Sequence, residues 1–312
     1  MENQNIIVLG HQNPDTDTII STIVYSQIKK KMGFDVKAGR LGEINKETKF
    51  VLSFFKQEAP ELIESVKEKQ VVLLDHNESS QSAVDIKEAD IVEIIDHHYI
   101  GNLSTQKPIY CRFEPIGSTS SLIFKLSQEK KIKLNKVQAG LLLAGLISDT
   151  LFLTSPTTTQ EDKKIAKELI KISKVNAKKL ADQMFEAKSD ISGMDIKDII
   201  KADYKEFSFK DSKIGIGVFE TAKPEVMSPK DPEIFQELEK LKQDQKIDFC
   251  FFLVVDILKQ NSVLYLISQK EEEVARNVFK GRIFERKMIL PGVVSRKKQV
   301  LPPLAEYFGE NS

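Results

Sequence analysis

The chain has 312 residues, of which 41% are hydrophobic and 29% are charged, a composition that excludes a disordered or repetitive protein and favours two globular domains over one core. Lys plus Arg and Asp plus Glu both number 46, so the formal net charge is zero. The overall charge therefore gives no indication of a nucleic-acid or membrane partner, and any anion site has to be local.

No stretch approaches the roughly 18 to 20 uninterrupted apolar residues of a membrane span. The first residues, Met1–Asn5, do not form the basic start of a secretion signal. We therefore expect a cytoplasmic protein. The two cysteines, Cys111 and Cys250, lie far apart in probable strands without metal-ligand spacing, and we expect both to be buried apolar residues.

The first predicted unit is a strand, a tight turn and a helix. An apolar run, Ile6–Leu9, is followed by the turn Gly10–Thr18, which carries His11, Asp15 and Asp17. Isoleucines and valines then recur at helical spacing from Thr18 towards Gly33. The two carboxylates should thus lie at a helix N-terminus, where the helix dipole favours anions.

The next strands also end on acidic and imidazole residues. A short strand is expected at Val36–Gly39, and helical segments at Glu47–Phe55 and Glu61–Lys67. Strand 71–74 ends on Asp75-His76-Asn77, and strand 91–95 ends on Asp96-His97-His98. Continuous apolar runs predict a parallel sheet covered on both faces, with the helical segments as crossovers.

Four further helices complete the first domain, at Gly117–Lys131, Asn135–Ser148, Gln160–Lys171 and Ala177–Ala187. The second of these is apolar nearly all round, which is typical of a helix buried in the centre of a domain. It carries Asp149 at its far end, and a carboxylate at the end of so apolar a helix indicates a role other than solubility.

The remainder of the chain predicts a second, smaller domain. Polar residues Lys188–Gly193 form the expected linker. Strands are expected at 207–209, 214–219, 249–257 and 262–267, and helices at 232–242 and 271–279. The predicted class is α/β: a domain of residues 1–187 with a mainly parallel sheet flanked by helices, a hinge at 188–193, and a C-terminal α/β domain of residues 194–312.

All four histidines of the chain, His11, His76, His97 and His98, occur in the three strand-end clusters. Singly, such a histidine is usually a hydrogen-bonded structural residue, and a lone aspartate after a strand is usually a helix cap. Together with the carboxylates they predict a metal site. Imidazole and carboxylate without thiolate favour Mn²⁺, Mg²⁺, Co²⁺ or Fe²⁺, and about six ligands suffice for two ions. A single structural ion is the alternative.

A basic segment, Ser295-Arg296-Lys297-Lys298-Gln299, follows Pro291-Gly292 near the end of the chain. Such a triplet is usually a solvated face. Beside an acidic metal centre, an arginine fork and ammonium groups would instead bind phosphate oxygens.

These motifs together resemble a known family. GHQNPDTD, VVLLDHNE, IIDHH and SRKKQ are similar, in order and spacing, to the family II (manganese-dependent) inorganic pyrophosphatases of the DHH phosphoesterase superfamily. The resemblance implies six metal ligands, with Asp75 bridging two Mn²⁺ ions, and Co²⁺ or Mg²⁺ as substitutes; these ligands are His11, Asp15, Asp17, Asp75, His97 and Asp149. It also implies a homodimer.

The same resemblance implies how substrate is held. His98 is expected to contact the substrate or the leaving phosphate, and Lys205, Arg296 and Lys297 to bind pyrophosphate from the second domain, together with additional Mg²⁺. Tyr99 follows the DHH motif where relatives carry a basic residue, which we interpret as a change at the edge of the site.

The sequence therefore predicts an inorganic diphosphatase, a hydrolase that converts pyrophosphate to two orthophosphates. A hydroxide bridging the metals would attack phosphorus in line in a cleft between the domains, with Asp75 and His98 as the catalytic residues. Closure about residues 188–193 would complete the site. One alternative is another DHH phosphoesterase acting on short polyphosphate or small nucleotides, and another is a metal-binding scaffold without catalysis. The first is disfavoured by the absence of a glycine-rich loop near the end of the chain, and the second by the complete set of motifs.

Overall fold

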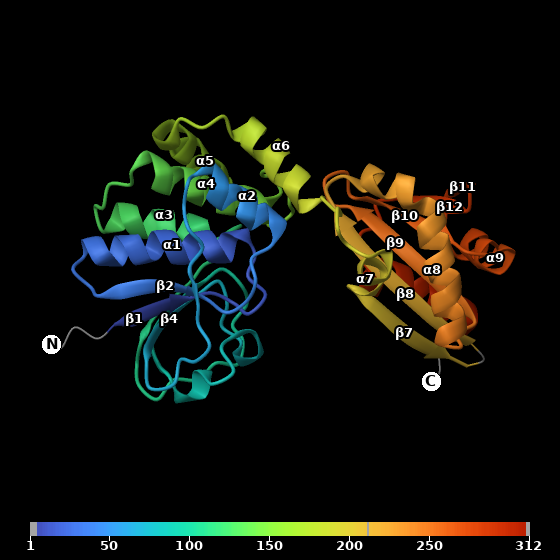
Figure 1. Cartoon of the computed structure of the whole chain (residues 1–312), viewed down its shortest axis with the longest axis horizontal. Coiled ribbons are helices and arrows are strands. Elements are labelled where there is room, and N and C mark those ends of the chain that lie inside the picture. Colours follow the sequence, from blue (N-terminus) through green and yellow to red (C-terminus); the bar gives the residue numbers. More distant parts are fainter. Residues whose placement is uncertain (1–4, 211, 310–312) are drawn as a thin grey trace. The chain divides into compact units, whose positions relative to one another are not determined.

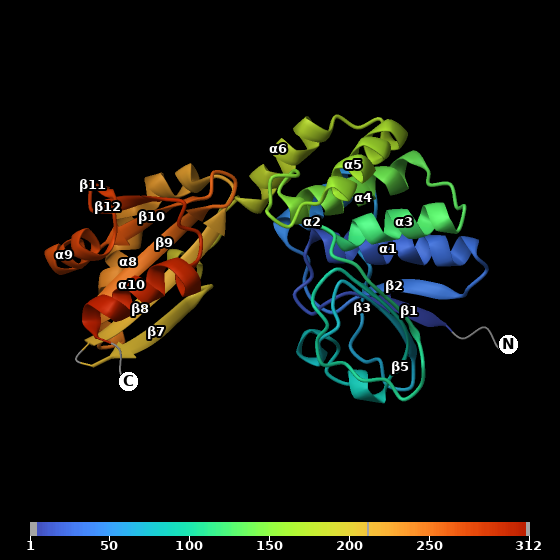
Figure 2. The ribbon, with the colours of Figure 1, turned by 180° about the vertical axis from the view of Figure 1, so that it is seen from behind.

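The computed structural model describes residues 5–210 and 212–309, and it divides the chain into two compact units, Met1–Ala187 and Lys188–Ser312. Figures 1 and 2 show the two from opposite sides. Each unit is built on its own six-stranded sheet. Among the described residues, no helix has the length and apolar character needed to cross a membrane.

The sheet of the first unit is entirely parallel, with the strand order β3-β2-β1-β4-β5-β6. Its strands are β1 (Ile6–Leu9), β2 (Val36–Arg40), β3 (Glu61–Leu62), β4 (Gln70–Leu74), β5 (Asp90–Asp96) and β6 (Tyr110–Phe113). Its helices are α1 (Thr16–Lys31), α2 (Lys46–Phe54), α3 (Thr119–Glu129), α4 (Lys136–Thr150), α5 (Gln160–Ser173) and α6 (Ala177–Lys188). The predicted parallel sheet is confirmed.

The α-helices gather on one face of this sheet, with α1 against β1, β2 and β4, and α3 against β5 (Figures 1 and 2). Both faces are covered, as predicted, but α-helices cover only this one within the described residues. The other face is covered by irregular segments and two 3-10 turns, η1 (Ser79–Gln81) and η2 (Ile86–Glu88). Ala83 and Ile86 from that region pack on Leu9 and Leu73, so both faces are nevertheless dry.

Several local predictions need correction. Residues 61–67 are not helical, because Glu61 and Leu62 pair with β2 at the sheet edge as β3. Helix α1 begins at Thr16, two residues before the expected start, since the Asp15 side chain caps it by accepting from the Thr18 N–H. Cys250 is buried as expected, but Cys111 is exposed, because it lies on the edge strand β6.

The second unit is a mixed sheet between two helical layers. Its strand order is β11-β12-β10-β9-β8-β7, and only β8 and β9 are parallel neighbours. The strands are β7 (Tyr204–Phe209), β8 (Ser212–Thr221), β9 (Phe249–Asp256), β10 (Asn261–Leu266), β11 (Arg282–Phe284) and β12 (Lys287–Pro291). The helical segments are α7 (Ile196–Lys201), η3 (Pro224–Lys230), α8 (Asp231–Asp244), α9 (Gln269–Val278), the π-helical turn η4 (Arg296–Val300) and α10 (Leu301–Phe308).

Alternating side chains of the central strand β9 define the two cores of this unit. Phe252 and Val254 pack with Leu238 of α8, whereas Phe251 and Leu253 pack with Leu304 of α10. The predicted smaller α/β domain is confirmed. The strand expected around Cys111 is β6, whereas α7, β11, β12 and α10 are short elements that periodicity did not predict.

Candidate metal centre

Three adjacent strands deliver the predicted ligands to one edge of the first sheet. Strands β1, β4 and β5 are neighbours and parallel, so their carboxyl ends lie together. His11 follows β1, Asp75 follows β4, and His97 follows β5. Polar side chains in turns at this edge converge on space that the sheet leaves open.

Asp75 lies at the centre of this edge, and its two carboxylate oxygens face different partners. Oδ2 is 3.7 Å from Nε2 of His11, and Oδ1 is 3.4 Å from Nε2 of His97. Thr18 donates to Oδ2 at 2.5 Å and Thr119 donates to Oδ1 at 2.8 Å. Asp75 has φ +65°, a left-handed conformation that aspartate tolerates better than most residues. The two hydroxyls and this backbone turn fix the carboxylate between the two imidazoles.

Asp15 and His11 complete one side of the centre, with His11 Nε2 3.6 Å from Asp15 Oδ2. On the other side, His97 Nε2 is 3.5 Å from Asp149 Oδ2 in the last turn of α4. Among the described residues, three groups of potential ligand atoms result, each within 4.8 Å: His11, Asp15 and Asp75; Asp17, Asp75, His97 and Asp149; and Asp75, His97 and His98. Asp75 is the member that they share.

Asp17 is fully buried and accepts backbone hydrogen bonds at the N-terminus of α3, from Thr119 N at 2.6 Å and Ser120 N at 3.0 Å. Helix α4 approaches this carboxylate closely because residue 145 is glycine. A Cβ at Gly145 would lie 2.6 Å from Asp17 Oδ1 and 2.2 Å from Ser120 Oγ. The close packing of α1, α3 and α4 thus requires glycine at position 145.

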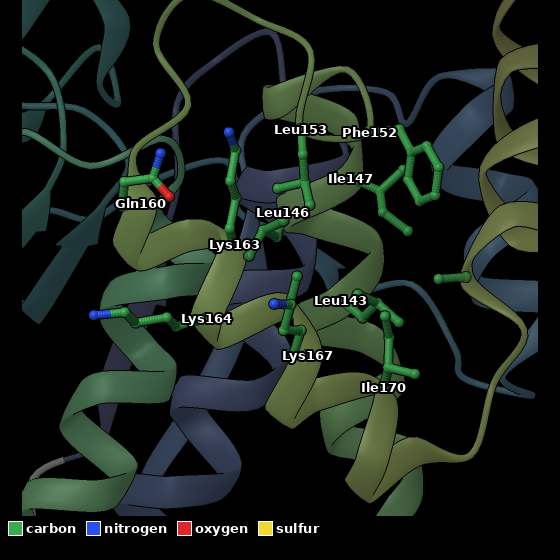
Figure 3. A pocket seen from close by; sticks show the side chains of 12 residues that line it. Leu143, Leu146, Ile147, Phe152, Leu153, Gln160, Lys163, Lys164, Lys167 and Ile170 are labelled. Carbon is green, nitrogen blue, oxygen red and sulfur yellow. The ribbon is translucent and has the colours of Figure 1, made fainter.

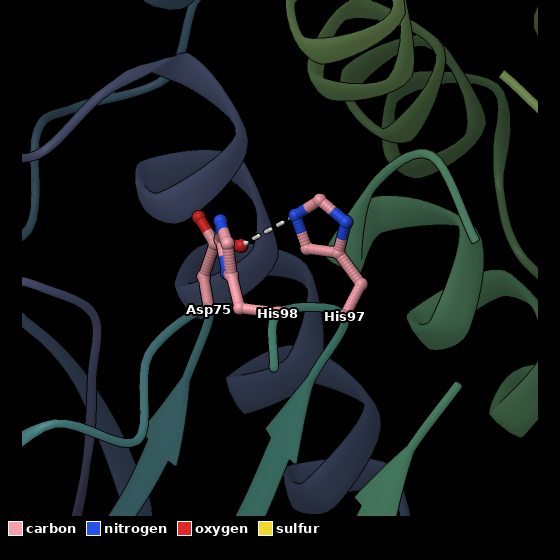
Figure 4. Close-up of side chains that lie close together, drawn as sticks. All are labelled: Asp75, His97 and His98. Carbon is pink, nitrogen blue, oxygen red and sulfur yellow. Dashed lines mark ion pairs between the residues drawn. The ribbon is translucent and has the colours of Figure 1, made fainter. Parts of the chain in front are cut away.

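The imidazole of His97 is oriented as a ligand. Its Nδ1 donates to the carbonyl of Ile116 at 2.9 Å, which directs Nε2 at Asp75 and Asp149. Figure 4 shows the ring of His97 turned towards the Asp75 carboxylate. Nε2 is buried without a hydrogen-bond partner in the part of the chain that the structure describes. A cation between these groups would satisfy the orphaned nitrogen.

The pKa values of the clustered groups show that the centre has an excess of buried carboxylates. Burial, with repulsion from Asp75, raises the pKa of Asp17 to about 7, and burial with repulsion from Asp17 raises that of Asp149 well above its usual value. Burial alone would raise the pKa of Asp75 and lower that of His97. Their close approach and mutual attraction instead depress the Asp75 pKa, and the neighbouring Asp75 and Asp149 carboxylates raise the His97 pKa to about 12. Buried carboxylates in such excess fit a centre made for cations.

The two remaining histidines differ. His98 is exposed, and its Nδ1 lies 2.8 Å from Oδ1 of Asp96, whose hydrogen bond raises the pKa of His98. His76 is buried, with Nδ1 3.0 Å from the Leu74 carbonyl and its ring edge-on to that of His11 at 6.5 Å between centroids. Sequence reasoning left His76 without a role, and in the structure its ring packs against that of His11.

A cavity of about 570 Å³ opens onto the centre within the first unit. Besides the expected residues it is lined by the segment 115–117 and by Gln81, Ser155 and Thr157. Sequence reasoning missed Gln81, Ser155 and Thr157, and also Thr18 and Thr119, because isolated hydroxyl and amide residues carry no distinctive spacing. Their positions relative to the ligands are set by the fold.

The predicted phosphate-binding residues lie in the second unit. The guanidinium of Arg296 is buried and donates to Asp203 Oδ1 at 2.7 Å and to the Ile216 carbonyl at 3.1 Å. Ile216 is the residue of β8 that pairs with Lys205 of β7, so Arg296 and Lys205 belong to one corner of this unit. Lys205 and Lys297 are exposed. The π-helical turn that starts at Arg296 is a feature frequent at functional sites.

Comparisons with known proteins agree with these motifs. A profile described as the DHH family, N-terminal domain, matches residues 5–146, and one described as the DHHA2 domain matches residues 182–307. The chain is 38% identical to a manganese-dependent inorganic pyrophosphatase of Bacillus subtilis, over 98% of this chain and 100% of that protein. It is 39% identical to a protein of the same description from Methanothrix thermoacetophila, over 97% and 98%.

Among solved structures, a proposed family II inorganic pyrophosphatase from Methanococcus jannaschii superposes with a TM-score of 0.68 at 38% identity. The superposition covers 97% of this chain and 99% of that one.

Proposed function

The chain belongs to the family of the manganese-dependent inorganic pyrophosphatases, and we propose that it hydrolyses pyrophosphate to two orthophosphates at the edge of the first sheet. The observation that carries the proposal is the position of Asp75, whose two oxygens each face a separate group of ligand atoms.

We assign the metal ligands as two sets that share Asp75. His11, Asp15 and Asp75 would hold one Mn²⁺, and Asp17, Asp75, His97 and Asp149 a second. The four carboxylates carry the charge needed to balance two divalent ions, and Co²⁺ or Mg²⁺ could replace Mn²⁺. Such a pair, when bound, supplies Lewis acidity and lowers the pKa of water towards neutrality.

The protein groups around the centre orient the reactants. Thr18 and Thr119 hold the Asp75 carboxylate, and the Ile116 carbonyl keeps Nε2 of His97 unprotonated towards the ions. His98 is exposed towards the cavity and is held by Asp96, so it can carry a proton to the leaving phosphate.

Lys205, Arg296 and Lys297 would bind the pyrophosphate oxygens, together with additional Mg²⁺ brought by the substrate. Asp203 fixes Arg296, which limits its rotamer freedom before substrate arrives. We further propose that closure about residues 188–193 brings these groups to the metal centre, which would place the working site between the domains. A cytoplasmic homodimer is part of this proposal and rests on the family resemblance.

The test is orthophosphate release from pyrophosphate by the purified protein loaded with Mn²⁺. Inactivity with the metal bound would exclude the proposal. Faster turnover of a short polyphosphate or a dinucleotide than of pyrophosphate would favour another phosphoesterase of the same superfamily.

The basic turn offers a matched pair of variants, because Lys297 and Lys298 are adjacent and both exposed. Lys297→Gln should lower kcat/KM for pyrophosphate by roughly tenfold or more, as expected for a lost charge-assisted contact of about 1.5–3 kcal/mol. Lys298→Gln should leave it near the wild-type value. Equal effects would show that only the general positive potential matters.

A further inference from the structure

A second pocket lies away from the metal centre, between α4, α5 and the turn that joins them (Figure 3). Its volume is about 410 Å³, which is within the range of small-molecule sites. None of the six assigned metal ligands lines it. It is therefore distinct from the cavity at the strand ends.

The inner surface of this pocket is apolar. Leu143, Leu146 and Ile147 of α4 form its floor, and they are almost completely inaccessible to solvent in the intact fold. Phe152 and Leu153 of the turn form one wall, and both remain partly exposed. A hollow lined this way excludes polar ligands and favours an aliphatic or aromatic body.

The turn that forms the wall is held in an unusual backbone conformation. Leu151, Phe152 and Leu153 have φ values of +48°, +54° and +67°, a run of left-handed residues without a glycine. Large apolar residues rarely adopt this region, so the surrounding packing has to maintain it. The effect of the turn is to direct Phe152 and Leu153 over the pocket (Figure 3).

The rim of the pocket is cationic. Lys163, Lys164 and Lys167 line it from α5, and all three are exposed. Within residues 5–210 and 212–309 none of these three lysines takes part in an ion pair. By contrast, Glu161 of α5 pairs with Lys125 of α3. Lys163 and Lys167 are four residues apart on one helix face, where like charges repel. An anionic group between them would relieve that repulsion.

We propose that this pocket binds an amphiphile with an apolar chain and one anionic head group, a medium-chain carboxylate. The chain lies against the partly exposed Phe152, Leu153 and Ile170, above the buried Leu143, Leu146 and Ile147, and the carboxylate is bound by Lys163 and Lys167. The apolar floor accounts for the chain, and the unpaired lysines account for the charge of the head group.

The test is calorimetric titration of the Mn²⁺-loaded full-length protein with decanoate, below the concentration at which decanoate forms micelles. We expect one saturable site, with affinity rising about three- to fourfold per methylene from octanoate to decanoate. Acetate, which can coordinate metal but has no chain, should not compete. Decanol, which lacks the charge, should bind at least tenfold more weakly.

Variants separate this site from non-specific attraction. Lys163→Gln combined with Lys167→Gln should weaken decanoate binding at least tenfold, and Phe152→Asn, which suits a left-handed backbone, should do the same. Lys171→Gln changes an exposed lysine of the same helix outside the pocket and should have no effect.

Absence of saturable binding, competition by acetate, or equal loss in Lys171→Gln would overturn the proposal. So would a change of oligomeric state in Phe152→Asn, measured by sedimentation, since the pocket would then be covered by a second copy of the chain. The readout is binding heat, so its result is independent of whether the protein hydrolyses pyrophosphate.

Discussion

Replacing Asp75 by Asn tests whether one carboxylate serves both halves of the metal centre. Asparagine has the same shape and also tolerates the φ of +65° found at this position, so the fold should persist. What changes is the charge: three carboxylates would remain to balance two divalent ions. One unit charge pair at about 4 Å is worth ~4 kcal/mol at an effective dielectric constant of about 20, or about a thousandfold in affinity. The loss for a divalent ion should be no smaller.

The thousandfold loss expected for Asp75→Asn should be compared with the effect of removing the hydroxyls that donate to the Asp75 carboxylate. Thr18→Val removes the donor to Oδ2 and Thr119→Val the donor to Oδ1, while the charge remains. Partners of metal ligands typically contribute about 10–100-fold in affinity. Each threonine variant should therefore weaken one of two Mn²⁺ binding events within that range, whereas Asp75→Asn should weaken both by at least about a thousandfold.

Calorimetric titration of metal-free protein with Mn²⁺ measures both events, and orthophosphate release measured in parallel should fall with them. The reasoning is refuted if Asp75→Asn retains both affinities, or loses only one of them. In the first case Asp75 is not a ligand, and in the second it does not bridge.

Three further predictions address the surroundings of the centre. Because the pKa of Asp17 is raised to about 7, the metal-free protein binds more protons when it is folded than when it is unfolded. Its unfolding free energy should therefore fall as the pH rises from about 4 to 7. Thermal melts in the presence of a chelator should show this fall, and Asp17→Asn should make it smaller. Gly145→Ala should lower the free energy of unfolding in denaturant by roughly 1–3 kcal/mol and weaken Mn²⁺ binding, since the added Cβ would meet Asp17 and Ser120. An unchanged denaturation midpoint would contradict the packing described. A thiol reagent should react with one cysteine of the native protein and with two after unfolding. The reason is that Cys111 is exposed, whereas Cys250 is buried and burial raises its pKa to about 12. Cys111→Ser should leave no reactive thiol in the native state.

Local sequence determined much of the architecture, because the physical signals are local. Mainly apolar runs of four or five residues specify strands β1, β4 and β5, and the polar cluster after each run fixes where it ends. Since parallel strands end at a common edge, the position of His11, Asp75 and His97 after three such strands predicted that they would meet. Family motifs then supplied their expected roles.

Elements without a strong period were decided by tertiary contacts. Residues 61–67 have helix-forming composition, yet Glu61 and Leu62 form a strand because the edge of β2 offers backbone partners. Cys111 resembles a core residue in sequence, but its strand has a neighbour on one side only. Local propensity cannot report which strand becomes an edge.

The detailed chemistry of the centre was likewise settled by distant residues. The motifs locate the Asp75 carboxylate, but Thr18 and Thr119, 57 residues before it and 44 after it, determine which oxygen faces which imidazole. The free nitrogen of His97 depends on the carbonyl of Ile116, and the close approach of α4 to Asp17 depends on Gly145. The sequence by itself determined which side chains meet, because each of them follows a strand and parallel strands end at a common edge. Only the tertiary structure decided their orientation and protonation, because those depend on packing between segments far apart in the chain.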